Sequence, residues 1–444
     1  MLLLAGLALS CVPLIQYHTE APDPAAGGAC QAESGTCSAA FIEEQPEYLL
    51  GFVEFDDLGW SWQRQQQHAL IARLEQEIKE RDVLMVVFVH GWKHNAESCD
   101  SNVTCFREVL RQLHATETAL AGKGTPRRIV GIYVGWRGDS ARGKLLRQTT
   151  FFGRKSTAHR VGSGAVTELL VRLKEIRNRR HRQLEAATPP HSSSTRLVLV
   201  GHSFGAALLY SATSPLIMER MAVAAASDTD RLVRGFGDLV VLVNPAFEAA
   251  RYQPLNATAE EGGFPPEQKP VLAIITSQGD KATGKAFPLG RSFSAKFDDY
   301  RSGPLRGEQR RANIRAVGHF APYRTHWLNA NPATPELSKP NRDLEASCEC
   351  PSRIMAGPTV SDAEVTQTVA DLRAHQWADD AELEFPTSTL VLDPGKLPAN
   401  SPLMVISVDA DIIPNHSDIY QLAFVDFLRY LIMSAGDPLE YPEG

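Results

Sequence analysis

The chain has 444 residues, of which 43% are hydrophobic and 8% aromatic, and its formal net charge is −7. This length suits two average domains or one large domain with insertions, and the apolar content excludes a disordered chain. The overall acidic balance excludes a chain-wide basic field that would hold nucleic acid, and the one dense run of basic residues, 177–182, is interpreted as the solvated end of a helix.

The first eleven residues are apolar and end at Cys11. They are too few to span a bilayer as a helix, but they resemble the hydrophobic part of a secretory signal peptide that lacks its preceding positive charge. Leu9-Ser10-Cys11 resembles a bacterial lipoprotein cleavage box. We therefore expect an exported protein, periplasmic or anchored to the outer membrane through a lipidated Cys11. A frayed apolar terminus is the alternative.

The cysteine pattern supports export. Once Cys11 is set aside, six cysteines remain as the close pairs 30/37, 99/105 and 348/350. Loop-like cysteine pairs of this kind are typical of disulfides formed in an oxidising compartment. Cys99–Cys105 is a plausible short bridge, whereas Cys348 and Cys350 are too close to pair comfortably, so one of them is expected to reach Cys30 or Cys37. A zinc site is the rival interpretation, which the absence of CxxC pairs disfavours.

In chain order, residues 12–45 are rich in Pro, Ala, Gly and Ser and are expected to form a tether. From residue 48, apolar runs alternate with segments of helical periodicity, which predicts an α/β domain over 46–444 with a mostly parallel sheet covered on both faces. The expected strands are 48–55, 83–89, 129–136, 197–200, 239–243, 271–276 and 403–408, and the expected helices are 61–81, 103–121, 157–180, 205–225 and 417–433.

Regular patterning weakens between residues 281 and 402. This stretch is too long for a bare loop and predicts a large insertion before the last strand, with some structure of its own. Its run 311–317 is a candidate extra strand. We expect the insertion to form a lid or a substrate-selecting cap, because such segments commonly gate access to a site.

The segment Gly201-His202-Ser203-Phe204-Gly205 joins an apolar run to a helical pattern. This context predicts a strand, a sharp turn and a helix, with the Ser203 hydroxyl raised clear of the sheet edge and the two glycines leaving room for close packing. His202 is interpreted as a packing or hydrogen-bonding group. A pentapeptide recurs by chance, so the interpretation of Ser203 as a nucleophile depends on partners elsewhere in the chain.

An oxyanion loop is the first such partner. His90-Gly91-Trp92 ends the strand 83–89, and its candidate donor is the backbone N–H of Trp92. The second donor would be the N–H of Phe204, the residue after the nucleophile. A plain strand-ending turn is the alternative interpretation of residues 90–92.

Acid and base candidates follow in the order that a hydrolase triad needs. Asp280 lies just after the strand 271–276, with Glu248 as the alternative acid; an exposed turn aspartate is the non-catalytic interpretation of Asp280. His416 lies between the last strand and the last helix and is the candidate base. His319 and His326, both in the insertion, are the alternative bases.

Together, HGW (90–92), YVGWRG (133–138), GHSFG (201–205), SQGDKAT (277–283) and NHSDI (415–419) resemble the α/β-hydrolase superfamily. More narrowly, they are similar to its uncharacterised lipase- and esterase-like members in bacteria and fungi. The resemblance covers about residues 48–290 and 400–435, and it implies the α/β-hydrolase fold with Ser203 as nucleophile, His416 as base and Asp280 as acid. The separation of Asp280 from His416 is longer than a minimal hydrolase needs.

These residues predict hydrolysis of carboxylic esters, either small molecules or lipids, through an acyl-enzyme intermediate and without a metal or organic cofactor. An acyltransferase or peptidase with the same triad is a second hypothesis, and a catalytically inactive binding module with this fold is a third. The sequence indicates no particular oligomeric state.

Overall fold

The computed structural model describes most of the chain, and Cys11 and the lipoprotein-like segment lie outside the described residues. The described residues are 13–22, 30–31, 39–138, 144–189, 193–227, 231–332, 334, 350, 361–374, 382–393 and 400–436. Among them, no helix is long and apolar enough to cross a membrane.

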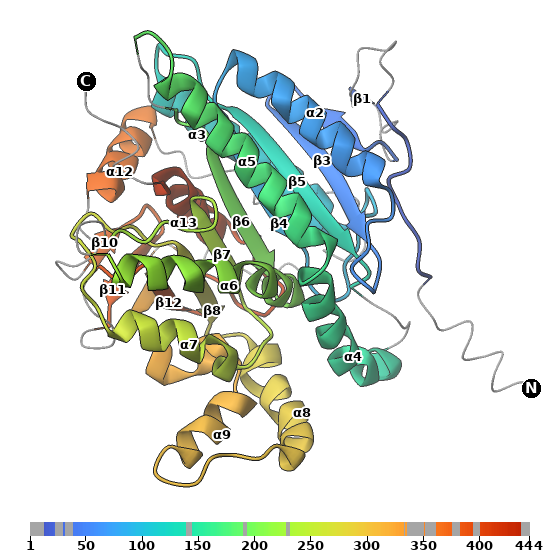
Figure 1. Cartoon of the computed structure of the whole chain (residues 1–444), viewed down its shortest axis with the longest axis vertical. Helices are drawn as coiled ribbons and strands as arrows, with labels where there is room; N and C mark the ends of the chain where they lie inside the picture. The colour runs from blue at the N-terminus through green and yellow to red at the C-terminus, as the bar shows by residue number, and fades with distance from the viewer. Residues whose placement is uncertain are drawn as a thin grey trace, which may run out of the picture.

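A twelve-stranded, mostly parallel sheet forms the centre of the molecule, and helices cover both of its faces (Figure 1). Its order is β1-β2-β3-β5-β4-β6-β7-β8-β12-β9-β11-β10, and only the pairs β2–β3, β9–β11 and β11–β10 are antiparallel. The strands are β1 (Cys30–Gln31), β2 (Ile42–Glu44), β3 (Tyr48–Phe55), β4 (Val83–Val89), β5 (Arg128–Trp136), β6 (Arg196–His202), β7 (Leu239–Val243), β8 (Leu272–Ser277), β9 (His326–Ala330), β10 (Glu382–Glu384), β11 (Ser388–Leu392) and β12 (Leu403–Val408).

Two hydrophobic cores lie on the two faces of the sheet. Along β4, Val83, Met85 and Val87 contribute to one core, whereas Leu84 and Val86 contribute to the other. This alternation explains why the central strands are continuous apolar runs, because both of their faces are buried. The helices are α2 (Arg64–Glu80), α3 (Ser101–Ala121), α4 (Lys144–Gly162), α5 (Ala165–Glu185), α6 (Phe204–Ala225), α7 (Ala249–Glu260), α8 (Phe287–Ser294), α9 (Arg306–Ile314), α12 (Asp362–Ala374) and α13 (Leu422–Ser434).

The seven predicted strands are all present within one or two residues of their expected ends. The helix predicted over 157–180 is instead two helices, since α4 ends at Gly162 and α5 begins at Ala165. A side chain at Gly162 would collide with the carbonyl oxygen of Leu208 on α6, so the close approach of these helices requires glycine there. The sequence did not indicate α7, and the run 311–317 belongs to α9 and the turn after it, so the extra-strand prediction is wrong.

The tether prediction for residues 12–45 is wrong in its described parts. Strand β2 pairs with β3, and the ring of His18 is fully buried and stacks on Phe52 with 3.6 Å between centroids. The backbone N–H groups of Tyr17 and His18 donate to the carboxylate of Glu54. A composition rich in small residues and proline did not reveal these few anchoring side chains.

The insertion at 281–402 is not a single cap. Its first part forms α8 and α9 at the carboxyl ends of the strands, but β9, β10 and β11 lengthen the sheet, and α12 packs against α3 and α13. These added strands are only three to five residues long, too short for alternation to stand out in the sequence.

The disulfide prediction requires correction as well. Cys105 bonds to Cys350, and Cys99 is bonded to a partner other than Cys105. Cys105 lies within α3 on its buried face, whereas Cys99 precedes the helix. The Cys105–Cys350 bond therefore joins the insertion to α3, across 245 residues of sequence.

Candidate active site

The carboxyl ends of four adjacent parallel strands, β6, β7, β8 and β12, meet at one edge of the sheet. The loops that follow these strands carry Ser203, Glu248, Asp280 and His416, respectively. Ligand and catalytic sites in open parallel sheets typically form at this edge. The topology therefore collects residues that are up to 213 positions apart in the sequence.

Ser203 lies at a sharp turn between β6 and α6 with φ 56° and ψ −114°, a conformation that non-glycine residues rarely adopt. A side chain at Gly205 would collide with the carbonyl oxygen of Val89, and one at Gly201 would lie 2.8 Å from the Cα of Ala206. Both glycines are thus needed for the strand and helix to pack this closely. This arrangement matches the geometry that the GHSFG pattern predicts.

A chain of hydrogen bonds joins the three predicted triad residues. Nε2 of His416 lies 2.7 Å from Oγ of Ser203, and its Nδ1 lies 2.8 Å from Oδ2 of Asp280. Ser203 and Asp280 are each 2% exposed, and the His416 side chain is 19% exposed. The imidazole is therefore the member of the chain that faces solvent most.

Asp280 is held as a carboxylate. Burial alone would raise its pKa, but the charge and hydrogen bond of His416, together with two hydrogen bonds from Thr283, lower the pKa to about 2. The backbone N–H of Ala282 also donates to it, at 2.9 Å. An ionised Asp280 accepts a hydrogen bond from the Nδ1–H group of His416, which leaves Nε2 as the acceptor for the Ser203 hydroxyl.

The His416 loop is fixed by residues that the sequence analysis did not single out as site residues. The carbonyl oxygen of His416 accepts hydrogen bonds from Nε2 of His202, at 2.8 Å, and from Nδ2 of Asn244, at 2.9 Å. Burial lowers the pKa of His202 well below its usual value, which keeps this imidazole neutral. The prediction that His202 is a hydrogen-bonding group is confirmed.

Asn244 follows β7 with a φ of 45°, and its Oδ1 accepts from the backbone N–H of Ser277 at the end of β8. The Ser277 hydroxyl in turn donates to the carbonyl oxygen of Ile413, at 2.5 Å. These bonds tie the loops after β7, β8 and β12 together. An asparagine directly after an apolar strand was the one available signal, because asparagine tolerates a positive φ better than most residues.

The HGW loop passes directly beside the turn at Ser203. A side chain at Gly91 would lie 2.9 Å from Cβ of Ser203, so glycine allows this approach. His90 anchors the loop: its Nε2 accepts from the backbone N–H of Trp136, and its Nδ1 lies 3.0 Å from the carbonyl oxygen of Gly91. Burial lowers the pKa of His90 to about 4, so the ring is neutral and has one donor and one acceptor.

The alternative acid, Glu248, makes no contact with the triad. It is buried and forms ion pairs with Lys155, Arg251 and Arg291. Burial would raise its pKa, but the adjacent Lys155 ammonium brings the pKa below its usual value.

The two alternative bases occupy different positions. The Nε2 atom of His319 lies 3.0 Å from the hydroxyl of Thr283, which itself donates to Asp280. His326 is in β9, and its Nδ1 lies 2.7 Å from the hydroxyl of Thr325. The structure thus brings His416 to both the serine and the acid, whereas His319 reaches the acid only through Thr283.

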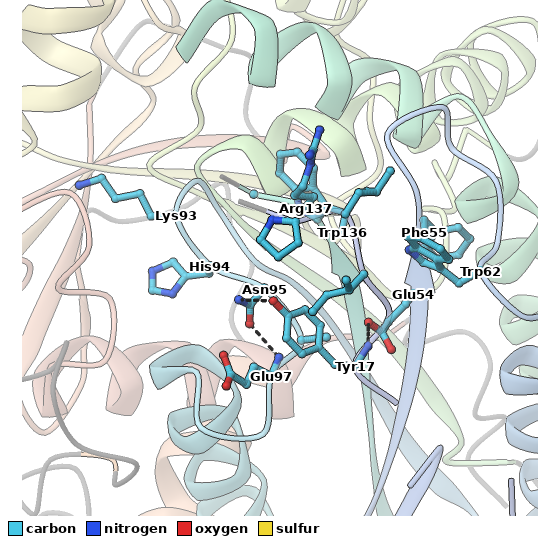
Figure 2. Close-up of a pocket in the computed structure, with 16 residues that line it drawn as sticks. Tyr17, Glu54, Phe55, Trp62, Lys93, His94, Asn95, Glu97, Trp136 and Arg137 are labelled. Carbon is cyan, nitrogen blue, oxygen red and sulfur yellow. Dashed lines mark hydrogen bonds between the residues drawn. The ribbon is translucent and has the colours of Figure 1, made fainter. Parts of the chain in front are cut away.

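A cavity of about 370 Å³ lies between the N-terminal segment, the ends of β3 and β5 and the residues that follow HGW, and no triad residue lines it (Figure 2). Its polar groups largely bind one another: Asn95 donates to the hydroxyl of Tyr17 and accepts from the backbone N–H of Glu97, and Glu54 accepts from the backbone of Tyr17. Arg137 pairs with Asp57. The cavity therefore marks where the N-terminal segment packs on the sheet.

Within the described ranges, no group of three His, Cys, Asp or Glu side chains is arranged to hold a metal ion. No known family model matches the chain, and no curated protein matches it either. The interpretation of the site consequently depends on its own geometry.

Proposed function

We propose that the protein is a serine hydrolase of the α/β-hydrolase superfamily that cleaves carboxylic esters through an acyl-enzyme intermediate. The observation that carries this proposal is the continuous hydrogen-bonded chain from Ser203 through His416 to Asp280, with the serine in a strained turn. Serine hydrolases on unrelated folds share this arrangement, in which a base lies between the nucleophile and an acid that orients the base.

In the first half of the reaction, His416 accepts the Ser203 proton at Nε2 while Ser203 Oγ attacks the ester carbonyl carbon. Asp280 remains ionised and stabilises the imidazolium through Nδ1, which its depressed pKa favours. The tetrahedral intermediate collapses when His416 returns the proton to the leaving alcohol, which leaves an acyl group on Ser203.

The oxyanion would be held by the backbone N–H groups of Trp92 and Phe204. Phe204 is the first residue of α6, where the helix dipole favours negative charge. Trp92 belongs to the loop that Gly91 brings against Ser203. Water, deprotonated by His416, then attacks the acyl carbon and releases the carboxylic acid and free Ser203.

Labelling with a fluorophosphonate tests the proposal, because this reagent phosphonylates an activated serine only. We expect stoichiometric labelling of the wild type and a loss of labelling and of ester turnover, by about 10⁶-fold, in Ser203→Ala. Equal labelling of wild type and Ser203→Ala would contradict the assignment.

Ser211→Ala is the matched control. The Ser211 hydroxyl on α6 also contacts a histidine, since it lies 2.6 Å from Nδ1 of His159. No carboxylate among the described residues binds His159 as Asp280 binds His416: Ser211 donates to the carbonyl oxygen of Ala207, and burial lowers the pKa of His159 to about 3. Ser211→Ala should therefore label and turn over esters like the wild type.

A further inference from the structure

An exposed apolar stripe lies on α8 and the turn that follows it. Leu289, Phe293 and Phe297 are spaced by four residues and are 67%, 69% and 90% exposed, respectively. Side chains at this spacing lie on one side of a helix. Leu305, just before α9, is 49% exposed. Large apolar side chains that gather in this way on a surface mark an interaction site.

The same segment is strongly basic. The α8–α9 hairpin, defined as residues 281–315, contains nine Lys or Arg residues and three Asp or Glu residues, a net charge of +6 in a chain whose net charge is −7. Eight of the nine are exposed, namely Lys281, Lys285, Lys296, Arg301, Arg306, Arg310, Arg311 and Arg315. None of these eight forms an ion pair with another described residue. Lys296 Nζ lies 5.2 Å from the ring centre of Phe293, so charge and apolar surface are adjacent.

Specific contacts hold the hairpin in place on the rest of the fold. Arg291, the ninth cation, donates to Asp298 and Asn313 and pairs with the buried Glu248. Asn313 also donates to Asp298, which links α9 to the end of α8, and Phe287, the first residue of α8, is fully buried. These contacts fix the base of the hairpin, and the apolar stripe remains exposed to solvent.

The hairpin projects from the edge of the sheet that carries the candidate site (Figure 1). It begins directly after Asp280, and the chain that leaves it reaches His319, which contacts Thr283 beside that carboxylate. The base of the hairpin therefore lies beside the acid of the candidate site.

We propose that the α8–α9 hairpin docks the protein on a bilayer surface that contains anionic phospholipids. Leu289, Phe293 and Phe297 enter the boundary between headgroups and acyl chains, and the surrounding cations contact lipid phosphates. Such a combination of apolar side chains with Lys and Arg is what interfacial helices use, and each cation near an anionic surface adds to the affinity. This binding does not depend on the proposed catalytic activity.

Charge complementarity favours a lipid surface over a polyanion alone. Binding of a nucleic acid or an acidic polymer uses the cations but leaves no reason for three aliphatic and aromatic side chains to stand exposed in a row. An apolar protein partner would use the row but not eight unpaired cations. A bilayer with anionic headgroups satisfies both features at once.

Vesicle flotation tests the proposal, with Cys11→Ser in every sample so that no lipid at that residue contributes. Vesicles of equal parts phosphatidylcholine and phosphatidylglycerol are compared with vesicles of phosphatidylcholine alone. We expect binding to the mixed vesicles that weakens with added salt and is much lower on the neutral ones. Phe293→Ser with Phe297→Ser should lower the partition coefficient by roughly tenfold or more. Lys285→Gln with Lys296→Gln should lower it by roughly fivefold per charge.

Matched controls use exposed residues elsewhere. Val171→Ser with Val223→Ser removes exposed apolar side chains on α5 and α6, and Lys79→Gln with Lys123→Gln removes exposed lysines; neither pair should change binding. Thermal unfolding confirms that each variant is folded. Ser203→Ala should bind vesicles like the wild type, which separates docking from catalysis. The proposal is overturned if mixed and neutral vesicles bind equally, if hairpin and control variants bind alike, or if the hairpin retains an acidic polymer such as heparin but not the vesicles.

Discussion

Two buried carboxylates at the same edge of the sheet have opposite surroundings. Asp280 follows β8 and Glu248 follows β7, and both are nearly inaccessible to solvent. Asp280 accepts hydrogen bonds from His416 and Thr283, whereas Glu248 pairs with Lys155, Arg251 and Arg291. The first orients an imidazole whose Nε2 reaches a serine; the second neutralises cations.

The difference shows that a position after a strand does not by itself make a carboxylate the acid of a triad. The groups that bind the carboxylate decide its role. The last strand, β12, lies beside β8 and not beside β7, and the loop that carries His416 therefore passes next to Asp280. The cations that pair with Glu248 come instead from three helices, α4, α7 and α8.

The largest effect is expected at the histidine that distinguishes the two carboxylates. His416→Ala should lower ester turnover by about 10⁶-fold, because nucleophile and base act as a unit. His319→Ala should lower turnover by roughly tenfold, since His319 acts on Asp280 only through Thr283. His326→Ala should remain near the wild-type rate, because its ring contacts Thr325 in β9.

Ester turnover is measured for each of the three variants after thermal unfolding has shown that it is folded. The Ser203→Ala, His416→Ala double variant should be no slower than either single variant. Near-normal turnover in His416→Ala together with its loss in His319→Ala would move the base to the other loop.

The second prediction compares the two carboxylates directly. Asp280→Asn should lower turnover by about 10⁴-fold through loss of the correct His416 tautomer, with the protein still folded. Glu248→Gln should instead destabilise the fold by roughly 3 kcal/mol, because it leaves the buried Lys155 ammonium unpaired, and turnover per folded molecule should change little. Turnover and chemical denaturation of both variants provide the measurement. Equal effects of the two substitutions on both quantities would refute the distinction.

The smallest expected effect is on the free energy of unfolding at low pH. The folded pKa of Asp280, about 2, lies below its ordinary value of 3.8, so its ionised form stabilises the fold. This contribution is complete above about pH 4 and is lost as the pH falls toward 2, for a total of about 2 kcal/mol. The free energy of unfolding, measured by chemical denaturation between about pH 4 and 2, should therefore fall more steeply with decreasing pH for the wild type than for Asp280→Asn. Equal pH dependence in the two proteins would show that Asp280 has an ordinary pKa.

The sequence alone determined the central strands and the chemistry-bearing turns. Continuous apolar runs such as 83–89 and 239–243 are detectable because a strand buried on both faces needs every side chain to be apolar. The turn at Ser203 was detectable because its glycines are required sterically. The segments 277–283 and 415–419 stood out for a different reason, as polar stretches in the connections that follow apolar strands.

Only the tertiary structure decided which of these residues meet. The order of strands places β12 next to β8, and this, more than any local pattern, brings His416 to Asp280 and Ser203. The roles of Asn244 and His202 arise from hydrogen bonds to a single carbonyl oxygen on a distant loop. The bond from Cys105 to Cys350 and the burial of His18 are equally long-range. Such contacts are set by how helices and strands pack in three dimensions, and hydrophobic periodicity reports only whether a segment faces a core.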